Sequence, residues 1–410
     1  MSVNKKVLYI TYDGMTDPLG QSQVLPYLIG LRPYGYDFTI LSFEKKDRFA
    51  KLSPVIQKIC DENGIRWVPM SFTSKPPLLS KFYDAVRIKR KAIALTRKYG
   101  FDMSHCRSYI GADVGMTLKK KFGTKLFFDM RGFWADEKKD GGSWPQSSFI
   151  FRQVYQYYKK KEAAYFKHAD QIISLTQAGK KEISSWTVYD ASVPINVIPC
   201  CADTKLFSLT GPDQKQAGRA LLGLPADAFI LSYLGSVGAW YMLDEMLELF
   251  RYIKQRYTGA RFLFITHSDP NMVLGRLAAH GLDPADMHIV SAGRQEVAPF
   301  VKASDINVSF IQPVYSKLSS SPTKLGEVLV MGIPVISNSG VGDVKQIIED
   351  ADAGVVLDTF TDADYRKAVD AIPGLMNKKP ADIRSAVEEM YSLETGVGSY
   401  LSCYQRVLGK

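Results

Sequence analysis

Short apolar runs alternate with longer amphipathic stretches along the 410-residue chain. In the first half, runs typical of strands are each followed by a polar turn or a helical pattern. These runs are VLYIT, FTILSF, KLFFDM (125–130), QIISLT (171–176) and NVIP (196–199). This order predicts a parallel α/β sheet, in which ligands bind beyond the carboxyl ends of the strands.

The alternation begins again in the second half, with the runs FILSYLG (229–235), ARFLFIT (260–266), MHIVSAG (287–293), INVSFI (306–311) and IPVIS (333–337). Because 410 residues exceed one ordinary core, we predict two doubly wound, Rossmann-like domains, residues 1–205 and 206–384. A linker is expected near 204–227, where Gly211, Pro212 and polar residues cluster. The last segment, about 385–410, is predicted to be helical.

The composition is typical of a globular enzyme, with 46% hydrophobic and 23% charged residues. No run approaches the about 20 apolar residues that cross a bilayer, and the N-terminus leads directly into a strand. The five cysteines show neither a disulfide framework nor zinc spacing, and the five histidines are scattered singly. We therefore expect a cytoplasmic protein that uses no metal ion.

The net charge of +10 is distributed unevenly. Residues 1–210 contain 33 lysines and arginines against 19 acidic residues, whereas residues 211–410 contain 19 against 23. The basic half is therefore expected to work next to something anionic: a membrane surface, a nucleic acid or a phosphate-bearing acceptor.

The densest basic stretch is 81–98, which contains the single acidic residue Asp84. Leu79, Phe82, Tyr83, Val86 and Ile93 recur in and beside it at near-helical spacing, which predicts a basic amphipathic helix. Such a helix can lie on anionic lipid. A solvated surface helix with its apolar side on the core is equally compatible with this pattern.

Residues 319–348, SSSPTKLGEVLVMGIPVISNSGVGDVKQII, carry the strongest chemical signal. Pro322 marks a helix start, where free N–H groups and the helix dipole favour an anion. Lys324 adds a positive charge in the first turn, and Glu327 lies three residues further on the same side. A cation and a carboxylate suit the diphosphate and ribose of a nucleotide, although this spacing also fits an ordinary surface pair.

A glycine-containing loop, Tyr12 to Gln23, follows the first strand. It contains Gly14 and Gly20, so its backbone N–H groups are candidates to face a phosphate. A glycine in such a turn is also explained by backbone shape alone.

Together these motifs resemble the glycosyltransferase family 4, which has the GT-B fold. The resemblance rests on the first strand and glycine loop, HADQIISLT (168–176), VIPCCADTKLF (197–207), LSYLGSVGAWYMLDEML (231–247) and the 319–348 segment. It covers nearly the whole chain, with the motifs in the same order.

The resemblance implies transfer of a hexosyl or N-acetylhexosaminyl group from a nucleotide sugar, with retention of anomeric configuration and no obligatory metal or cofactor. It implies two domains that face a central cleft, and a C-terminal helix that crosses back to the N-terminal domain. Glu327 would hold the ribose and Lys324 the diphosphate. The further donor-binding candidates are Gly20, Gly235, Ser236 and Ser321.

Three positions depart from the family pattern. Ser319 stands where many members have a second carboxylate, and Arg131 stands where a base-like histidine is common. The segment Val237–Tyr241 lacks the usual basic residue.

We therefore expect the leaving diphosphate to accept the acceptor proton while protein cations stabilise its charge. The candidate catalytic residues are Lys324, Arg294 and Arg131, and the candidate acceptor-side residues are Asp129, Arg131, Asp136 and Glu137. The basic N-terminal half would hold a glycan or lipid-linked acceptor, as in bacterial surface polysaccharide synthesis.

Other functions fit the same fold. A nucleotide-sugar epimerase or a sugar phosphorylase would also use a phosphate cleft, and a donor-binding scaffold without turnover would explain the substitutions at Ser319 and Arg131. Nucleic-acid binding is the weakest alternative, because no recognition motif accompanies the basic charge and the C-terminal half is acidic.

Overall fold

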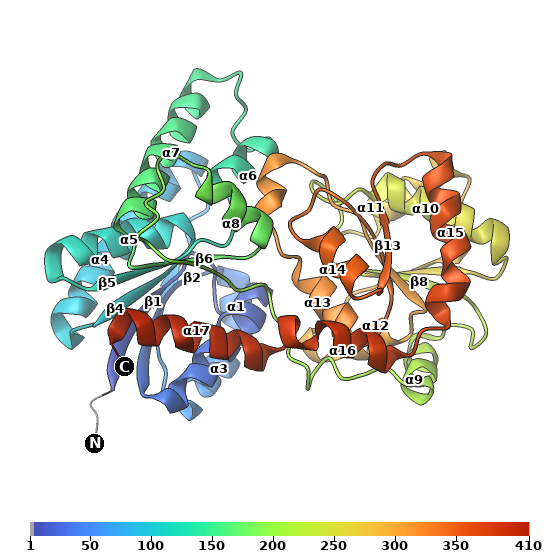
Figure 1. Ribbon diagram of the computed structural model, residues 1–410, viewed down its shortest axis with the longest axis horizontal. Helices are drawn as coiled ribbons and strands as arrows, with labels where there is room; N and C mark the ends of the chain where they lie inside the picture. Colours follow the sequence, from blue (N-terminus) through green and yellow to red (C-terminus); the bar gives the residue numbers. More distant parts are fainter. Residues whose placement is uncertain (1–3, 410) are drawn as a thin grey trace. The chain divides into compact units, whose positions relative to one another are not determined.

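The computed structural model describes residues 4–409, and its chain forms two compact units (Figure 1). The N-terminal unit comprises the chain up to Pro199 together with the segment from Leu393, and the C-terminal unit comprises Cys200–Ser392. The sequence places these boundaries near residues 205 and 384. Residues 1–3 and 410 of the predicted ranges lie outside the described residues.

Within the described residues, the N-terminal unit contains a seven-stranded sheet of order β3-β2-β1-β4-β5-β6-β7, in which every pairing is parallel. Its strands are β1 (Lys5–Ile10), β2 (Tyr36–Glu44), β3 (Arg66–Ser71), β4 (Met103–Arg107), β5 (Lys125–Asp129), β6 (Gln171–Ser174) and β7 (Ile195–Val197). Its helices are α1 (Pro18–Gln23), α2 (Leu25–Leu31), α3 (Lys46–Glu62), α4 (Pro77–Tyr99), α5 (Ser108–Phe122), α6 (Trp134–Asp140), α7 (Phe149–His168), α8 (Gln177–Ser184) and α17 (Leu393–Leu408).

The C-terminal unit contains, in the described chain, a six-stranded parallel sheet of order β10-β9-β8-β11-β12-β13. Its strands are β8 (Ile230–Leu234), β9 (Arg261–Ile265), β10 (Met287–Val290), β11 (Ile306–Ser309), β12 (Val335–Asn338) and β13 (Gly354–Leu357). Its helices are α9 (Pro212–Leu222), α10 (Leu243–Arg256), α11 (Asn271–Leu274), α12 (Arg294–Lys302), α13 (Thr323–Val330), α14 (Val344–Asp350), α15 (Asp362–Met376) and α16 (Pro380–Tyr391).

Strand side chains of the C-terminal unit alternate between two hydrophobic cores. In β8, Ile230 and Leu234 belong to the core that includes α13, whereas Leu231 and Tyr233 belong to the core that includes α10 and α15. Because neighbouring strand residues point to opposite faces, a sheet covered on both faces needs nearly continuous apolar runs. This explains the runs in the sequence, and the predicted doubly wound architecture is confirmed.

The apolar runs did not reveal β3, β4 and β13. Strand β4 has the sequence MSHCR and lies between β1 and β5, with all five residues buried. Its buried His105 and Arg107 contact other polar side chains. This central strand therefore does not have the apolar sequence that is typical of a buried strand. Figure 1 shows it in the interior of the sheet.

The predicted linker at 204–227 is wrong, because the C-terminal unit begins at Cys200 and helix α9 lies inside that range. Gly211 is the N-cap residue of α9 and Pro212 is its first residue. Proline is favoured at the first helical position, where its missing N–H has no intrahelical partner to lose. The Gly-Pro pair therefore marks a helix start.

The basic helix is present as α4, and of the two alternatives left open, the one in which its apolar side packs on the core is wrong. Phe82, Tyr83 and Val86 are 57%, 58% and 48% exposed. The buried positions recur every four residues instead and include Asp84 and Ile88. Asp84 is buried because its carboxylate accepts hydrogen bonds from neighbouring polar groups, namely Tyr12, Thr73 and Arg87.

The C-terminal segment forms two helices, α16 and α17, on either side of Ser392. Helix α17 belongs to the N-terminal unit. There the rings of Tyr400 and Tyr404 pack against Tyr27 and Tyr36 respectively. Side chains from the end of the chain therefore lie beside the strands of the N-terminal sheet.

Candidate functional site

The C-terminal sheet has a switch point between β8 and β11, because the chain continues from β8 to one side and returns as β11 on the other. In open parallel sheets, ligands bind at the carboxyl ends of strands where the order reverses. Gly235 and Ser236 follow β8, and α13 follows β11. The two segments meet here, since a Cβ added to Gly235 would lie 3.4 Å from Nζ of Lys324.

Lys324 is 8% exposed and lies between two tyrosine rings. Its Nζ donates a hydrogen bond to the Tyr233 hydroxyl at 3.2 Å and lies 4.3 Å and 3.9 Å from the ring centroids of Tyr233 and Tyr241. Across residues 4–409 it forms no ion pair. Burial holds the pKa of this amine well below its usual value, and a bound anion would favour the charged form.

Glu327 is 9% exposed and has no ion-pair partner within the described chain. Burial raises the pKa of its carboxyl to about 7, and the positive charge of Arg294 partly opposes this shift. The surface-pair interpretation is wrong, because Lys324 and Glu327 are both buried and form no ion pair with each other. One short helix therefore carries a buried amine and a buried carboxyl, and neither has an ion-pair partner among the described residues.

The start of α13 supplies further polar groups. Pro322 is the N-cap residue, and the first-turn N–H groups of a helix have no acceptor within that helix. Just before it, the Ser321 hydroxyl oxygen accepts a hydrogen bond from the Cys200 amide at 3.2 Å. Ser319, which stands at the expected carboxylate position, is buried and donates to the Ser316 carbonyl.

Aromatic residues occupy the segment that lacks the expected basic residue. Tyr241 covers the Lys324 amine, while the ring of Trp240 lies 3.8 Å from Nζ of Lys317. Ala239, directly before Trp240, has a φ of 44°, which is uncommon for a residue with a side chain. The sequence did not indicate the roles of Tyr233 in β8 and Tyr241 after it. An aromatic residue in or near an apolar strand is expected to be part of the hydrophobic core.

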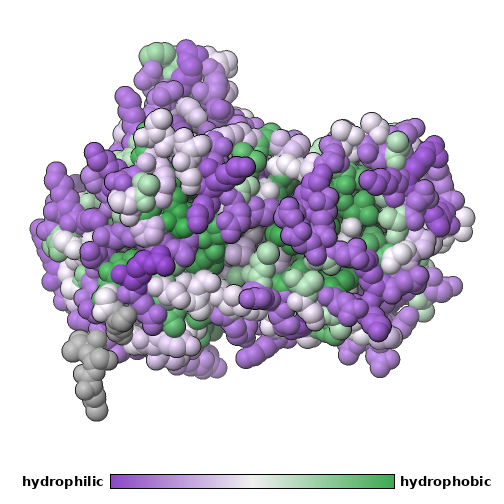
Figure 2. Space-filling view, viewed as in Figure 1, coloured by the Kyte–Doolittle hydropathy of each residue, from purple (hydrophilic) through white to green (hydrophobic). Residues whose placement is uncertain are grey.

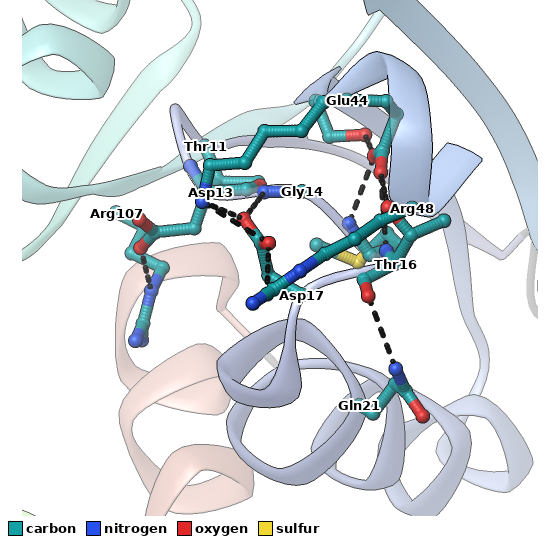
Figure 3. Close-up of polar contacts among 12 residues, drawn as sticks. Thr11, Asp13, Gly14, Thr16, Asp17, Gln21, Glu44, Arg48 and Arg107 are labelled. Atoms are coloured by element: carbon teal, nitrogen blue, oxygen red, sulfur yellow. Dashed lines mark hydrogen bonds and ion pairs between the residues drawn. The ribbon is translucent and has the colours of Figure 1, made fainter. Parts of the chain in front are cut away.

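Gly20 belongs to the N-terminal unit, whereas the other donor candidates belong to the C-terminal unit. A Cβ there would lie 2.2 Å from the Gly14 carbonyl oxygen, so close packing requires glycine. The nearby loop amides of Met15 and Thr16 donate to the buried carboxylate of Glu44 at 2.8 Å and 3.1 Å (Figure 3). These loop amides therefore bind a carboxylate from the end of β2, and the donor role of Gly20 stays a prediction.

Asp129 lies at the end of β5 within a buried polar cluster. Its Oδ2 accepts hydrogen bonds from the Tyr400 hydroxyl at 3.2 Å and lies 3.3 Å from Nε2 of His105. The charges of Arg131 and Arg107, together with His105, outweigh burial and lower the pKa of Asp129. Burial lowers the pKa of His105, so its ring stays neutral near pH 7.

Arg131 follows Asp129, with Nη1 3.9 Å from Oδ1 of Asp129. Its φ of 59° is left-handed. Backbone strain of this kind gathers at functional sites. The structure thus brings Asp129 and Arg131 together with His105 and Tyr400, two residues that the sequence analysis did not single out.

Asp136 and Glu137 lie on α6. Asp136 is buried and accepts hydrogen bonds from Tyr155 at 2.7 Å and Lys159 at 3.0 Å, both on α7. It therefore ties α6 to α7. Glu137 is half-buried, and the acceptor-side role of both carboxylates stays a prediction.

Comparison with solved structures identifies the fold. Sucrose-phosphate synthase from Thermosynechococcus elongatus matches with a TM-score of 0.72 and 16% identity, over 99% of this chain and 100% of that chain. Anabaena HepE, in complex with UDP and glucose, matches with 0.70 and 12%, over 98% and 99%. WaaG, a glycosyltransferase involved in lipopolysaccharide biosynthesis, matches with 0.68 and 16%, over 97% and 99%.

This chain has the GT-B fold. No protein-family model matches the sequence. A search of curated proteins also finds no match. Identities of this size show the fold alone. No helix in the described part of the chain is long and apolar enough to cross a membrane.

Proposed function

We propose that this protein is a nucleotide-sugar-dependent glycosyltransferase that resembles family 4 and retains anomeric configuration. The observation that carries the proposal is the pair of unpaired, buried groups, Lys324 and Glu327, at the β8/β11 switch point. A lysine amine and a carboxyl that are buried without an ion-pair partner among the described residues are unfavourable in their charged forms in the free protein. A nucleoside diphosphate would pair with both groups, because its phosphates carry negative charge for Lys324 and its ribose hydroxyls donate hydrogen bonds to Glu327.

The donor roles follow from this geometry. Lys324 and the first-turn N–H groups of α13 bind the diphosphate, with Gly235 and Ser236 admitting it close to the backbone. Glu327 accepts hydrogen bonds from the ribose. Ser321 and Gly20 complete the proposed donor contacts. We propose UDP as the nucleotide, since the HepE structures with this fold contain UDP.

The proposed reaction takes place on one face of the sugar. The acceptor oxygen forms a bond to the anomeric carbon as the bond from that carbon to the leaving diphosphate breaks. The acceptor proton passes to a leaving phosphate oxygen, so no protein base is needed. Lys324 and Arg294 stabilise the negative charge that develops on the diphosphate, and Arg131 acts on the acceptor side. No metal ion or cofactor enters this scheme.

The acceptor is proposed to be a glycan or lipid-linked sugar bound by the N-terminal unit, in bacterial surface polysaccharide synthesis. The exposed apolar side of α4, formed by Phe82, Tyr83 and Val86, lies among basic residues. Amphipathic surfaces of this composition bind anionic bilayers. We propose a cytoplasmic protein that associates peripherally with the inner face of the plasma membrane.

The test combines binding and turnover. UDP at about 100 times its Kd should stabilise the protein by about 2.7 kcal/mol and raise the melting temperature by several degrees. Lys324→Ala and Glu327→Ala should lose most of this rise. Lys345→Ala is the matched control, because this half-buried lysine pairs with Asp358 elsewhere in the same unit.

Turnover is measured as release of UDP from UDP-glucose, UDP-galactose and UDP-N-acetylglucosamine, with and without a panel of octyl glycosides. Acceptor-dependent release supports transfer, whereas interconversion of the sugars would indicate an epimerase. UDP binding without turnover would favour the inactive scaffold. Full activity of Lys324→Ala and Glu327→Ala would contradict the assigned donor site.

A further inference from the structure

The N-terminal sheet has its own switch point, between β1 and β4. The chain passes from β1 to β2 on one side, and β4 lies on the other side of β1. Asp13 lies in the loop after β1, and Arg107 is the last residue of β4. These two residues therefore stand where open parallel sheets bind their ligands.

Arg107 is buried, and its guanidinium lies beside a buried carboxylate. It is 4% exposed, and its register partner on β5 is Asp129. Nη1 of Arg107 lies 4.0 Å from Oδ2 of Asp129, which the Tyr400 hydroxyl also contacts. This Nη1 is buried and donates no hydrogen bond to any described residue. A buried guanidinium is retained at a cost of several kcal/mol unless it is well paired, which argues for a role beyond packing.

Arg107 fixes one oxygen of the Asp13 carboxylate by a hydrogen bond. Nε of Arg107 donates to Oδ2 of Asp13 at 3.2 Å, and the Asp13 amide donates to the Thr11 hydroxyl oxygen at 3.0 Å (Figure 3). The Asp13 side chain is nevertheless 46% exposed. Its Oδ1 accepts no hydrogen bond from residues 4–409. One oxygen is thus fixed, and the other is available to a ligand.

Asp17 in the same loop shows the contrast. Its carboxylate is 11% exposed and accepts hydrogen bonds from Lys45 and Arg48 (Figure 3). Both carboxylate oxygens of Asp17 therefore already have partners within the protein. Asp13 therefore differs from Asp17 because one of its carboxyl oxygens has no hydrogen-bond partner among the described residues and its side chain is exposed at the switch point.

The backbone around this group is strained at two places. Ser108, directly after Arg107, has a φ of 61°, and Arg131, near the end of β5, has a φ of 59°. Left-handed residues other than glycine persist where surrounding structure imposes them, and they cluster at ligand sites. Ser108 follows β4, which borders the switch point, and Arg131 follows β5, the next strand in the sheet.

We propose that Asp13 is an acceptor-binding carboxylate, whose Oδ1 accepts hydrogen bonds from the hydroxyl groups of a sugar. Arg107 is a positioning residue that fixes Oδ2. Hydrogen bonds to an ionised carboxylate are shorter and about twice as strong as those between neutral groups, so a rigid carboxylate selects neutral, polyhydroxylated ligands. This inference rests on the proposed transferase function and names the acceptor chemistry of its N-terminal unit.

The probes are methyl glycosides of glucose, galactose, mannose and N-acetylglucosamine, in the presence of saturating UDP. Saturation-transfer NMR should show binding of at least one of them to the unmodified full-length protein. Asp13→Asn should weaken that affinity at least tenfold. The melting-temperature rise caused by UDP should stay unchanged in this variant, because the proposed donor contacts at the β8/β11 switch point are intact.

Asp17→Asn is the matched control, since it makes the same change in the same loop but removes an internally paired carboxylate. It should leave glycoside affinity within about twofold of the original. For Arg107, the conservative Arg107→Lys should raise the acceptor KM with octyl glycosides more than it lowers kcat, and Arg107→Ala should raise it further.

Three results would overturn the proposal. Two concern binding: equal glycoside affinity in Asp13→Asn and the original protein, and failure of every methyl glycoside to bind the original protein while UDP still binds. Loss of kcat in Asp13→Asn at unchanged acceptor KM would also overturn it, because it would make Asp13 a catalytic group. Absence of UDP binding to the original protein would instead contradict the proposed function.

Discussion

At the residue scale, Glu327 is a carboxyl group whose environment opposes ionisation. It is buried on α13, and the positive charge of Arg294 only partly offsets the effect of burial. The spacing of Pro322, Lys324 and Glu327 was readable in the sequence. The sequence did not indicate that Lys324 and Glu327 form no ion pair. The direction of the Lys324 side chain depends on Tyr233 and Tyr241, which surround its amine in the folded protein.

This environment predicts a pH-dependent stability. The folded pKa of about 7 exceeds the usual glutamate value of about 4.3. Below pH 4 the carboxyl is protonated in both states. As pH rises towards 7, the unfolded state loses its proton first, so the folded state becomes less stable. At about 1.4 kcal/mol for each pH unit between the two pKa values, the loss is complete above pH 7 and amounts to about 4 kcal/mol.

Glu327→Gln removes this dependence. In the absence of nucleotide, the difference in free energy of unfolding between Glu327→Gln and the original protein should grow by about 2–3 kcal/mol from pH 5 to pH 8. Urea unfolding at several pH values measures it. Parallel stability curves for the two proteins would show that the carboxyl ionises freely in the folded state.

At the element scale, α13 depends on close packing with α16. A Cβ added to Gly326 would lie 2.8 Å from Cδ1 of Tyr391, which is buried on α16. The same short helix carries Lys324 and Glu327. The packing of one side of α13 thus positions the proposed donor groups.

Gly326→Ala should therefore destabilise the protein by about 1–3 kcal/mol, because overpacking forces the ring or the helix to move. Gly374→Ala is the control: this glycine also lies in a helix, but no atom lies within 4 Å of its added Cβ. Alanine there should stabilise by up to about 1 kcal/mol. Thermal unfolding of both variants measures the contrast, and equal effects would refute the packing argument.

At the scale of the whole molecule, charge differs between the two halves of the chain. Hydrophilic side chains cover most of the face in Figure 2, and apolar side chains appear at the free end of α7. Helix α7 begins with Phe149 and Ile150, which are exposed, like Phe82 and Tyr83 on α4. Exposed apolar side chains surrounded by basic residues are typical of surfaces that bind the interface of an anionic bilayer.

Membrane association is tested by flotation with vesicles of phosphatidylcholine, with and without phosphatidylglycerol. The protein should float only with the anionic lipid, and high salt should weaken binding. Replacement of Phe82, Tyr83 and Val86 by serine should reduce the bound fraction several-fold. Leu221→Ser, an exposed position of the C-terminal unit, is the control. Unchanged flotation of the triple variant would exclude α4 as the docking surface.

The sequence by itself determined the two parallel α/β units, since a sheet covered on both faces requires apolar runs at its strands. It also determined the chemistry at the start of α13, where Pro322, Lys324 and Glu327 occupy one or two turns of a helix. These features are local in the chain. Periodicity and helix-start rules are therefore sufficient to predict them.

Only the tertiary structure decided which distant groups meet. Asp13 and Arg107 become neighbours because β4 pairs with β1, and strand order is a non-local property. Tyr400 reaches Asp129 because the last helix packs on the first unit. The inward side of α4 was likewise set by partners of Asp84 from other segments. Hydrogen-bond partners outside the segment decide such placements, and local patterns carry no information about them.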